Sequence, residues 1–183
     1  MTFRYTLFVV LTLVMTAFLS YGTYTTNRLL RTWVPDRNLL LLPGETVVRL
    51  FLIAGCIGLG ILSGLPYGQL GWTWTGWGAN LLLGSLLGAV LAFLFIAGTR
   101  RLLRTGGSRF YSDQILVHIV PKTGREWVWV ALAMIGVALL EELLFRSLLL
   151  GGLTPVLPAW LLLIGAALLF GALHSPQGLW GMG

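Results

Sequence analysis

Long runs of apolar residues, separated by short polar segments, organise the whole chain. The runs lie at about 5–24, 46–64, 79–98, 127–150 and 158–174. Each run has about the length at which an α-helix crosses a bilayer, which needs roughly 17–25 residues. Helix-breaking residues separate the runs, at Pro35, at Pro43-Gly44 and across the glycine-rich segment 63–78. The pattern predicts an all-α, polytopic transmembrane helical bundle with about five membrane helices.

The first run begins directly after Arg4, as the apolar part of a signal peptide would. The run continues through Leu19, Ser20 and Tyr21 without the small-x-small pattern of a cleavage site. A retained first transmembrane helix is therefore favoured over a cleaved signal peptide.

The most polar segment is the basic loop 99–126, between the third and fourth runs. It carries Arg100, Arg101, Arg104, Arg109, Lys122 and Arg125. Within it, the apolar patch from Phe110 to Val120 is too short to span a bilayer and is interpreted as an interfacial helix. His118 lies in this patch and is interpreted as a packed residue. The tryptophans of segment 63–78 are interpreted as anchors at the membrane–water interface.

Composition supports a membrane protein with one domain, residues 1–183. Hydrophobic residues make up 57% of the chain and charged residues only 10%, more apolar surface than a soluble domain can bury. The net charge of +6 is interpreted as basic loops that face anionic membrane lipids, rather than as a nucleic-acid site. Cys56 is the only cysteine, which excludes a disulfide within the chain.

Three charged residues interrupt the apolar run 127–150. They are Glu141, Glu142 and Arg146, and an ionisable group at a membrane helix centre costs about 2.5–3.5 kcal/mol. Glu142 and Arg146 are four residues apart, so they share a helix face and can pair, whereas Glu141 points elsewhere. One interpretation is a structural ion pair with a second glutamate bonded to a neighbouring helix. The other is a catalytic site in which Glu141 is a general base.

A histidine ends the next run. His174 has Phe170 one turn before it, on the same helix face. The short turn 151–157 makes the fourth and fifth helices antiparallel neighbours, so His174 is expected to approach Glu141 if the helices tilt or the fourth extends. Catalytic zinc takes three protein ligands and a water; Glu141 and His174 supply at most two.

These two helices resemble a known family. Glu141-Glu142-x-x-x-Arg146 followed by Phe170-x-x-x-His174 is similar to the first two motifs of the CPBP intramembrane proteases. That family includes the type II CAAX prenyl proteases and bacteriocin-processing or immunity proteins. The resemblance covers about residues 135–180; the upstream helices are similar only in hydrophobic character.

The resemblance implies an intramembrane endopeptidase. A glutamate-activated water would hydrolyse a peptide bond in a prenylated or membrane-associated peptide. Glu141 would be the base, Glu142 and Arg146 its support, and His174 a partner of the water or of a metal. Whether a divalent metal such as zinc takes part is left open by the resemblance.

One motif of the family is missing from the sequence. The family has a third motif, a histidine followed four residues later by Asn or Asp. This chain has only His118, with Lys122 four residues later, and His174. We therefore expect a truncated or incomplete product rather than a complete five-helix enzyme. The alternative function is a catalytically silent immunity or scaffold protein with a structural Glu142–Arg146 pair. An ion or proton carrier has less support, because no inverted repeat is visible.

The distribution of basic residues predicts a membrane orientation. The loops 23–46 and 99–126 are basic and should face the cytoplasm. This orientation places the N-terminus outside, whereas Arg4 favours an N-terminus inside.

Overall fold

The computed structural model describes residues 2–30, 32–33, 35, 37–105, 116–175 and 179–182. Its elements are α1 (Phe3–Leu29), η1 (Leu39–Leu41), α2 (Pro43–Ser63), α3 (Trp77–Arg104), α4 (Leu116–Ile119), α5 (Gly124–Glu141), η3 (Glu142–Gly151), α6 (Ala159–Leu173) and α7 (Leu179–Met182). The chain is an all-α membrane protein, as predicted, and the part that the structure describes contains helices and no strands.

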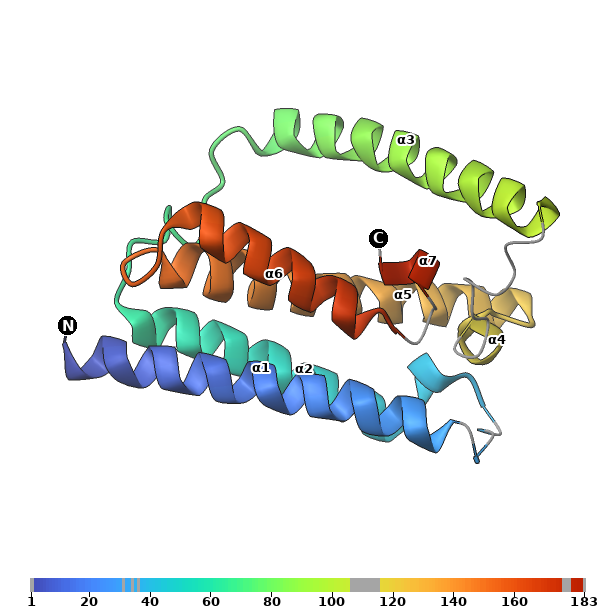
Figure 1. Cartoon of the computed structure of the whole chain (residues 1–183), viewed down its shortest axis with the longest axis horizontal. Coiled ribbons are helices and arrows are strands. Elements are labelled where there is room, and N and C mark those ends of the chain that lie inside the picture. Colours follow the sequence, from blue (N-terminus) through green and yellow to red (C-terminus); the bar gives the residue numbers. More distant parts are fainter. Residues whose placement is uncertain are drawn as a thin grey trace.

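Four helical segments are long and apolar enough to cross a membrane. They are α1, α2, α3 and the continuous helix Gly124–Gly151, which α5 and η3 form together. The fifth predicted membrane helix is α6, which is apolar but has only 15 residues. Its length of about 22 Å is shorter than a hydrocarbon core of about 30 Å. The long helices alternate in direction along the chain, as Figure 1 shows.

The core lies where α1, α2, η3 and α6 meet. Its buried residues are Tyr5, Phe8, Cys56, Leu143, Leu144, Leu148, Leu149, Leu153 and Leu162. Five of the nine come from the stretch of η3 and the two residues after it, so this stretch is the part of the chain that the other helices surround. The core therefore fixes the segment that carries the charged residues. The Cys56 side chain is fully buried and has a packing role.

The first turn of α1 contacts the C-terminal ends of both η3 and α2. The Tyr5 hydroxyl donates to the Gly152 carbonyl, at 2.8 Å, and joins α1 to the C-terminal end of η3. The Arg4 guanidinium donates to the carbonyls of Ile61 and Leu62 in the last turn of α2. Carbonyls at a helix C-terminus lack partners within the helix and attract cations. Arg4 therefore caps α2.

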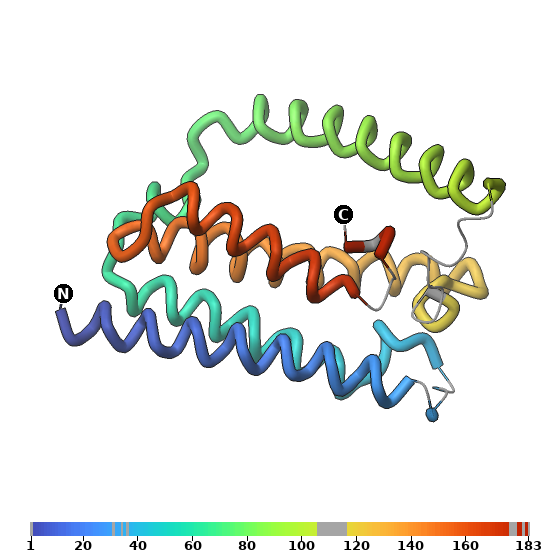
Figure 2. The backbone as a smooth tube through the Cα atoms, in the orientation of Figure 1, coloured from blue at the N-terminus to red at the C-terminus, as the bar shows by residue number. Residues whose placement is uncertain are grey.

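Helix α3 has no buried residue along its 28 positions. It lies apart from α1 and α2, on the far side of α5 and α6, in both the ribbon and the tube (Figures 1 and 2). Its described contacts include the Trp180 side chain of α7, whose Nε1–H donates to the Thr99 hydroxyl at 2.9 Å. The Gly84-x-x-x-Gly88 spacing, which resembles a helix-packing motif, has no neighbour in the described structure within 4 Å of either glycine.

Candidate active site

The charged residues lie where an α-helix changes into a π-helix. The backbone of Glu141 and Glu142 stays in the right-handed helical region, so α5 continues into η3 without a break. Hydrogen bonds of a π-helix run from residue i to residue i+5, and such segments are frequent at functional sites. The sequence predicted a single α-helix over 127–150; the change to π geometry at Glu142 is a difference that the structure adds.

Glu141 and His174 come together where α6 packs against the continuous α5–η3 helix. Glu141 ends α5 and His174 follows the last residue of α6. The His174 Nε2 lies 4.0 Å from the Glu141 Oε1, and both side chains are partly buried. The structure thus brings two sequence-predicted residues from neighbouring antiparallel helices into one small site.

The His174 ring has a defined orientation. Its Nδ1 lies 2.9 Å from the Phe170 carbonyl oxygen, and a carbonyl can only accept, so the Nδ1–H is the donor. The Nε2 is then the nitrogen that faces Glu141. The ring also packs on Phe170, with centroids 4.3 Å apart, and Phe170 meets the edge of Phe145 from η3 at 5.1 Å. This aromatic row holds α6 and η3 together beside the Glu141–His174 pair.

Glu142 and Arg146 form a second, separate pair. The Arg146 Nη1 lies 2.9 Å from the Glu142 Oε2, and the two side chains are 72% and 55% exposed. Both residues belong to η3, so their ion pair joins no two helices. Among the described residues, no ion pair connects this pair to Glu141 or His174. The pair has the four-residue spacing that the sequence predicted for it.

The loop between α2 and α3 forms hydrogen bonds with η3 and with the turn that follows it. The Trp72 Nε1–H donates to the Ser147 hydroxyl, at 2.9 Å. Gln69 donates to the Gly151 carbonyl and to the Thr154 hydroxyl, at 3.2 and 2.7 Å. The sequence interpretation of Trp72 as an interfacial anchor is therefore incomplete, because its indole hydrogen-bonds to η3.

At this junction Pro158 occupies the N-cap position of α6, and the Thr154 hydroxyl accepts from the Gln69 side chain. Ser147 was not singled out from the sequence, although it is the one hydroxyl residue in the apolar stretch 143–150. That isolation is a usable signal, because a buried hydroxyl needs a partner.

The described residues of this site supply only part of a metal-binding set. His174 has the orientation of many metal-binding histidines, with its other ring nitrogen bonded to a backbone carbonyl. Glu141 and His174 supply two donors. Among the residues that the structure describes, no group of three His, Cys, Asp or Glu side chains lies close enough together to hold a metal ion. Catalytic zinc normally takes three protein ligands, so these residues alone do not complete a zinc site.

The comparison with protein families matches the same part of the chain. Residues 123–183 match the family described as type II CAAX prenyl endopeptidase Rce1-like. The matched segment spans α5, η3, α6 and α7, and therefore includes Glu141, Glu142, Arg146 and His174. No curated protein and no solved structure gives a match. Through residues 123–183, this integral membrane chain is related to the CPBP/CAAX family of intramembrane proteases.

Proposed function

We propose that this chain is an intramembrane endopeptidase in which Glu141 and His174 activate a water molecule. The observation that carries the proposal is the approach of the Glu141 Oε1 to the His174 Nε2, at 4.0 Å, from two neighbouring helices. A base and a second polar group at this separation can both contact one water, because two hydrogen bonds of about 2.8 Å each span such a gap.

The protonation of His174 defines the direction of these hydrogen bonds. With the Nδ1–H donated to the Phe170 carbonyl, the Nε2 of the neutral ring accepts. A water between the two residues donates one hydrogen to the Glu141 carboxylate and the other to the His174 Nε2. Its lone pairs then point toward an incoming peptide carbonyl carbon.

Hydrolysis follows from this arrangement by general acid–base catalysis. Glu141 takes a proton from the water as the oxygen attacks the carbonyl carbon. The C–N bond of the tetrahedral intermediate then breaks, and the proton passes from Glu141 to the departing amine. The products are an amine and a carboxylic acid, which keeps the second proton of the water, and Glu141 returns to its starting state. No step requires a metal ion; a divalent metal such as zinc would need ligands beyond Glu141 and His174.

The proposed substrate is a peptide held at the membrane. The site lies between apolar helices rather than on a soluble domain, which favours a prenylated or membrane-associated peptide. The description of the matched family, a prenyl endopeptidase, supports the same substrate class.

Proteoliposomes that contain the full chain test this function. Wild-type protein should cleave a farnesylated CAAX-type peptide, and cleavage should be lost in Glu141→Gln, which keeps the shape of the side chain but cannot accept the proton. The matched control is Glu45→Gln. Glu45 pairs with Arg49 on α2, and glutamine retains an acceptor for that contact, so activity should persist. Circular dichroism and the elution volume establish that each variant is folded.

Two outcomes would contradict the proposal. Equal cleavage by wild-type protein and folded Glu141→Gln would remove Glu141 from the mechanism. No cleavage by wild-type protein, with or without added zinc, would favour the catalytically silent alternative. That alternative used the Glu142–Arg146 pair to hold the bundle, and it has less support because both residues lie on η3 and are exposed.

A further inference from the structure

A basic cavity lies at the end of the molecule where α5 begins. Its volume is about 720 Å³, and its walls come from the segment before η1, from α4 and from the start of α5. The side chains that matter for its chemistry are Arg37, His118, Lys122, Arg125, Glu126 and Trp129. None of them belongs to the Glu141–His174 site.

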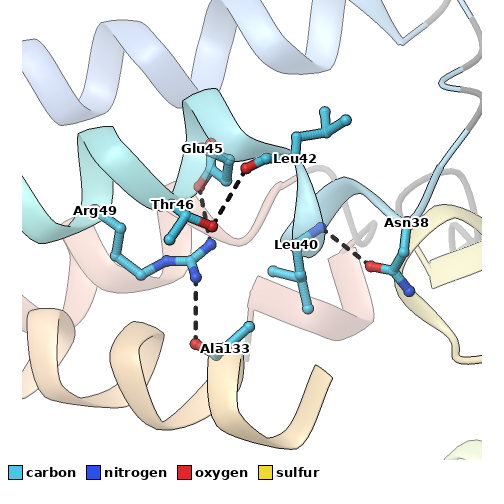
Figure 3. Close-up of polar contacts among 7 residues, drawn as sticks. All are labelled: Asn38, Leu40, Leu42, Glu45, Thr46, Arg49 and Ala133. Carbon is cyan, nitrogen blue, oxygen red and sulfur yellow. Dashed lines mark hydrogen bonds and ion pairs between the residues drawn. The ribbon is translucent and has the colours of Figure 1, made fainter. Parts of the chain in front are cut away.

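Hydrogen bonds from one side chain to the backbone of two segments hold the walls of this cavity in place. The Asn38 side chain donates to the Ile119 carbonyl of α4, at 2.9 Å, and accepts from the Leu40 N–H, at 3.1 Å. The second of these contacts is drawn in Figure 3. Asn38 thus ties the segment before η1 to α4.

The start of α5 is fixed by its own cap. The Thr123 hydroxyl accepts from the Glu126 N–H, at 3.2 Å, and the Glu126 carboxylate accepts from the Lys122 N–H, at 2.7 Å. These two contacts form the cap of α5. They engage the Glu126 carboxylate, which is the one carboxylate among the residues that line the cavity. The capped start of α5 therefore gives the basic side chains of the cavity a backbone that is held in place.

The charge of the cavity favours an anion. Three cations, Arg37, Lys122 and Arg125, face one carboxylate. Of the ion pairs formed between described residues, none involves these three cations. The N-terminus of α5, an 18-residue helix, adds a positive dipole end to the same region. Arginine and lysine are the usual ligands of phosphate groups.

A second cavity indicates that the anion carries an apolar part. This cavity has a volume of about 500 Å³ and follows α2 and α5 away from the basic end. Leu41 and Trp129 line both cavities, so the two adjoin. The walls of the second one are largely apolar and include Leu50, Ile53 and Leu132; Arg49 is the one charged residue that lines it. A ligand that occupied both would have an anionic head and a hydrocarbon chain.

We propose that the adjoining cavities bind an anionic phospholipid, with the phosphate headgroup among Arg37, Lys122 and Arg125 and an acyl chain between α2 and α5. The residues beside the basic cavity agree with this ligand. The exposed Trp127 and Trp129 at the start of α5 are residues typical of the membrane–water interface, where headgroups lie. This site is independent of the proposed peptidase activity.

Lipid binding by the purified full chain tests the proposal. Native mass spectrometry, with lipid added at known concentrations, gives apparent dissociation constants for phosphatidylglycerol and for phosphatidylcholine of the same acyl chains. Wild-type protein should bind phosphatidylglycerol more tightly. In Arg37→Gln/Lys122→Gln/Arg125→Gln this preference should largely disappear, since each cation near a membrane surface contributes about a fivefold change in affinity.

The matched control removes three positive charges outside the cavity. Arg100→Gln/Arg101→Gln/Arg104→Gln changes the C-terminal turn of α3, which lies at the same end of the molecule (Figure 1). This variant should keep the preference for phosphatidylglycerol. The single variant Arg37→Gln, in a connection outside the helices, should weaken it and provides a test if the triple variant fails to fold.

Three results would overturn the proposal. Equal losses in the two triple variants would show a general surface attraction instead of a site. Equal binding of phosphatidylcholine would contradict the role of the charge. Displacement of phosphatidylglycerol by an equal concentration of inorganic phosphate or glycerol 3-phosphate would identify a soluble anion, not a lipid, as the ligand.

Discussion

At the scale of single residues, the contact between Gly60 and Trp72 determines how the α2–α3 loop packs. A side chain at Gly60 would overlap the six-membered ring of Trp72, whereas Gly58, half a turn away, has no neighbour in the described structure within 4 Å. Gly60 is therefore needed for the close approach of the indole to α2, and Gly58 is not.

The two glycines give a matched pair of substitutions. Gly60→Ala should destabilise the protein by about 1–3 kcal/mol, because the added methyl displaces the Trp72 ring from a packed position. Gly58→Ala should be neutral or stabilising by up to about 1 kcal/mol, as alanine is the better helix residue. Unfolding midpoints of both variants in the same detergent check the difference, and equal midpoints would show that the ring does not pack there.

The Trp72–Ser147 hydrogen bond gives a second prediction. Trp72→Phe keeps most of the aromatic packing but leaves the buried Ser147 hydroxyl without its described donor, which should cost about 1–3 kcal/mol. Trp74→Phe is the control, because Trp74 is 86% exposed and should tolerate the change.

A double-mutant cycle isolates this bond. Adding Ser147→Ala to Trp72→Phe removes both partners, so the combined loss of stability should be smaller than the sum of the single losses. If the losses of stability in the two single variants simply add in the double variant, the indole and the hydroxyl do not interact.

The sequence allowed one pair of the site to be predicted directly and the other only under a condition. Charged residues in an apolar run are conspicuous, and the four-residue spacing pairs Glu142 with Arg146 directly. The approach of His174 to Glu141 was expected only if the helices tilt or the fourth helix extends, because spacing along each helix does not define how α6 packs on the continuous α5–η3 helix. The contact of Trp72 with Ser147 joins positions 75 residues apart, and no local pattern predicts such a tertiary contact.

At the scale of elements, Arg49 shows how one charged residue joins two membrane helices. It lies on α2, is buried, and donates to the Ala133 carbonyl of α5, at 3.4 Å, and to the Glu45 carboxylate, at 3.3 Å (Figure 3). Its Cδ packs 3.2 Å from the position that a side chain at Gly136 would occupy. Glu45 is half exposed and lies one turn nearer the N-terminal end of α2. The Arg49 guanidinium is therefore directed toward the membrane surface.

This geometry predicts which part of Arg49 stabilises the α2–α5 contact. Arg49→Ala should lose about 2–4 kcal/mol, because it removes the packing of the long stem on Gly136 as well as the two hydrogen bonds. Arg49→Met should recover much of that loss, since it restores the stem and removes a buried charge. Unfolding midpoints of the two variants check the order; a methionine variant as unstable as the alanine variant would assign the stability to the charge.

The helices themselves were predictable, because hydrophobic runs of this length have few alternatives in a bilayer. The π geometry of η3 was not predictable from the same pattern. Its buried residues, Leu143, Leu144, Ser147, Leu148 and Leu149, fit an apolar helix of either kind, and their packing on α1, α2 and α6 is what distinguishes the two. The short length of α6 follows from Pro158, which begins it, and from His174, which ends it.

At the scale of the whole molecule, basic residues gather at one end. The last turns of α1 and α3, the segment before η1 and the start of α5 all lie at the end opposite the N-terminus, and carry Arg28, Arg37, Arg100, Arg101, Arg104, Lys122 and Arg125 (Figures 1 and 2). In the sequence, Arg4 was the one residue that argued against an orientation with this end in the cytoplasm. Because its guanidinium bonds to the last carbonyls of α2, Arg4 has a structural role that needs no cytoplasmic position.

This arrangement predicts a definite orientation in the membrane. The basic end should face the cytoplasm, and the N-terminus and the α2–α3 loop should lie on the other side. Single cysteines placed in a Cys56→Ser background, at the exposed positions Thr75 and Thr105, report the two sides. In intact cells a membrane-impermeant maleimide should label Thr75→Cys and should not label Thr105→Cys. Permeabilised cells should label both. The reverse pattern would place the basic end outside, and would mean that Arg4, despite its bonds to α2, decides the insertion of the first helix.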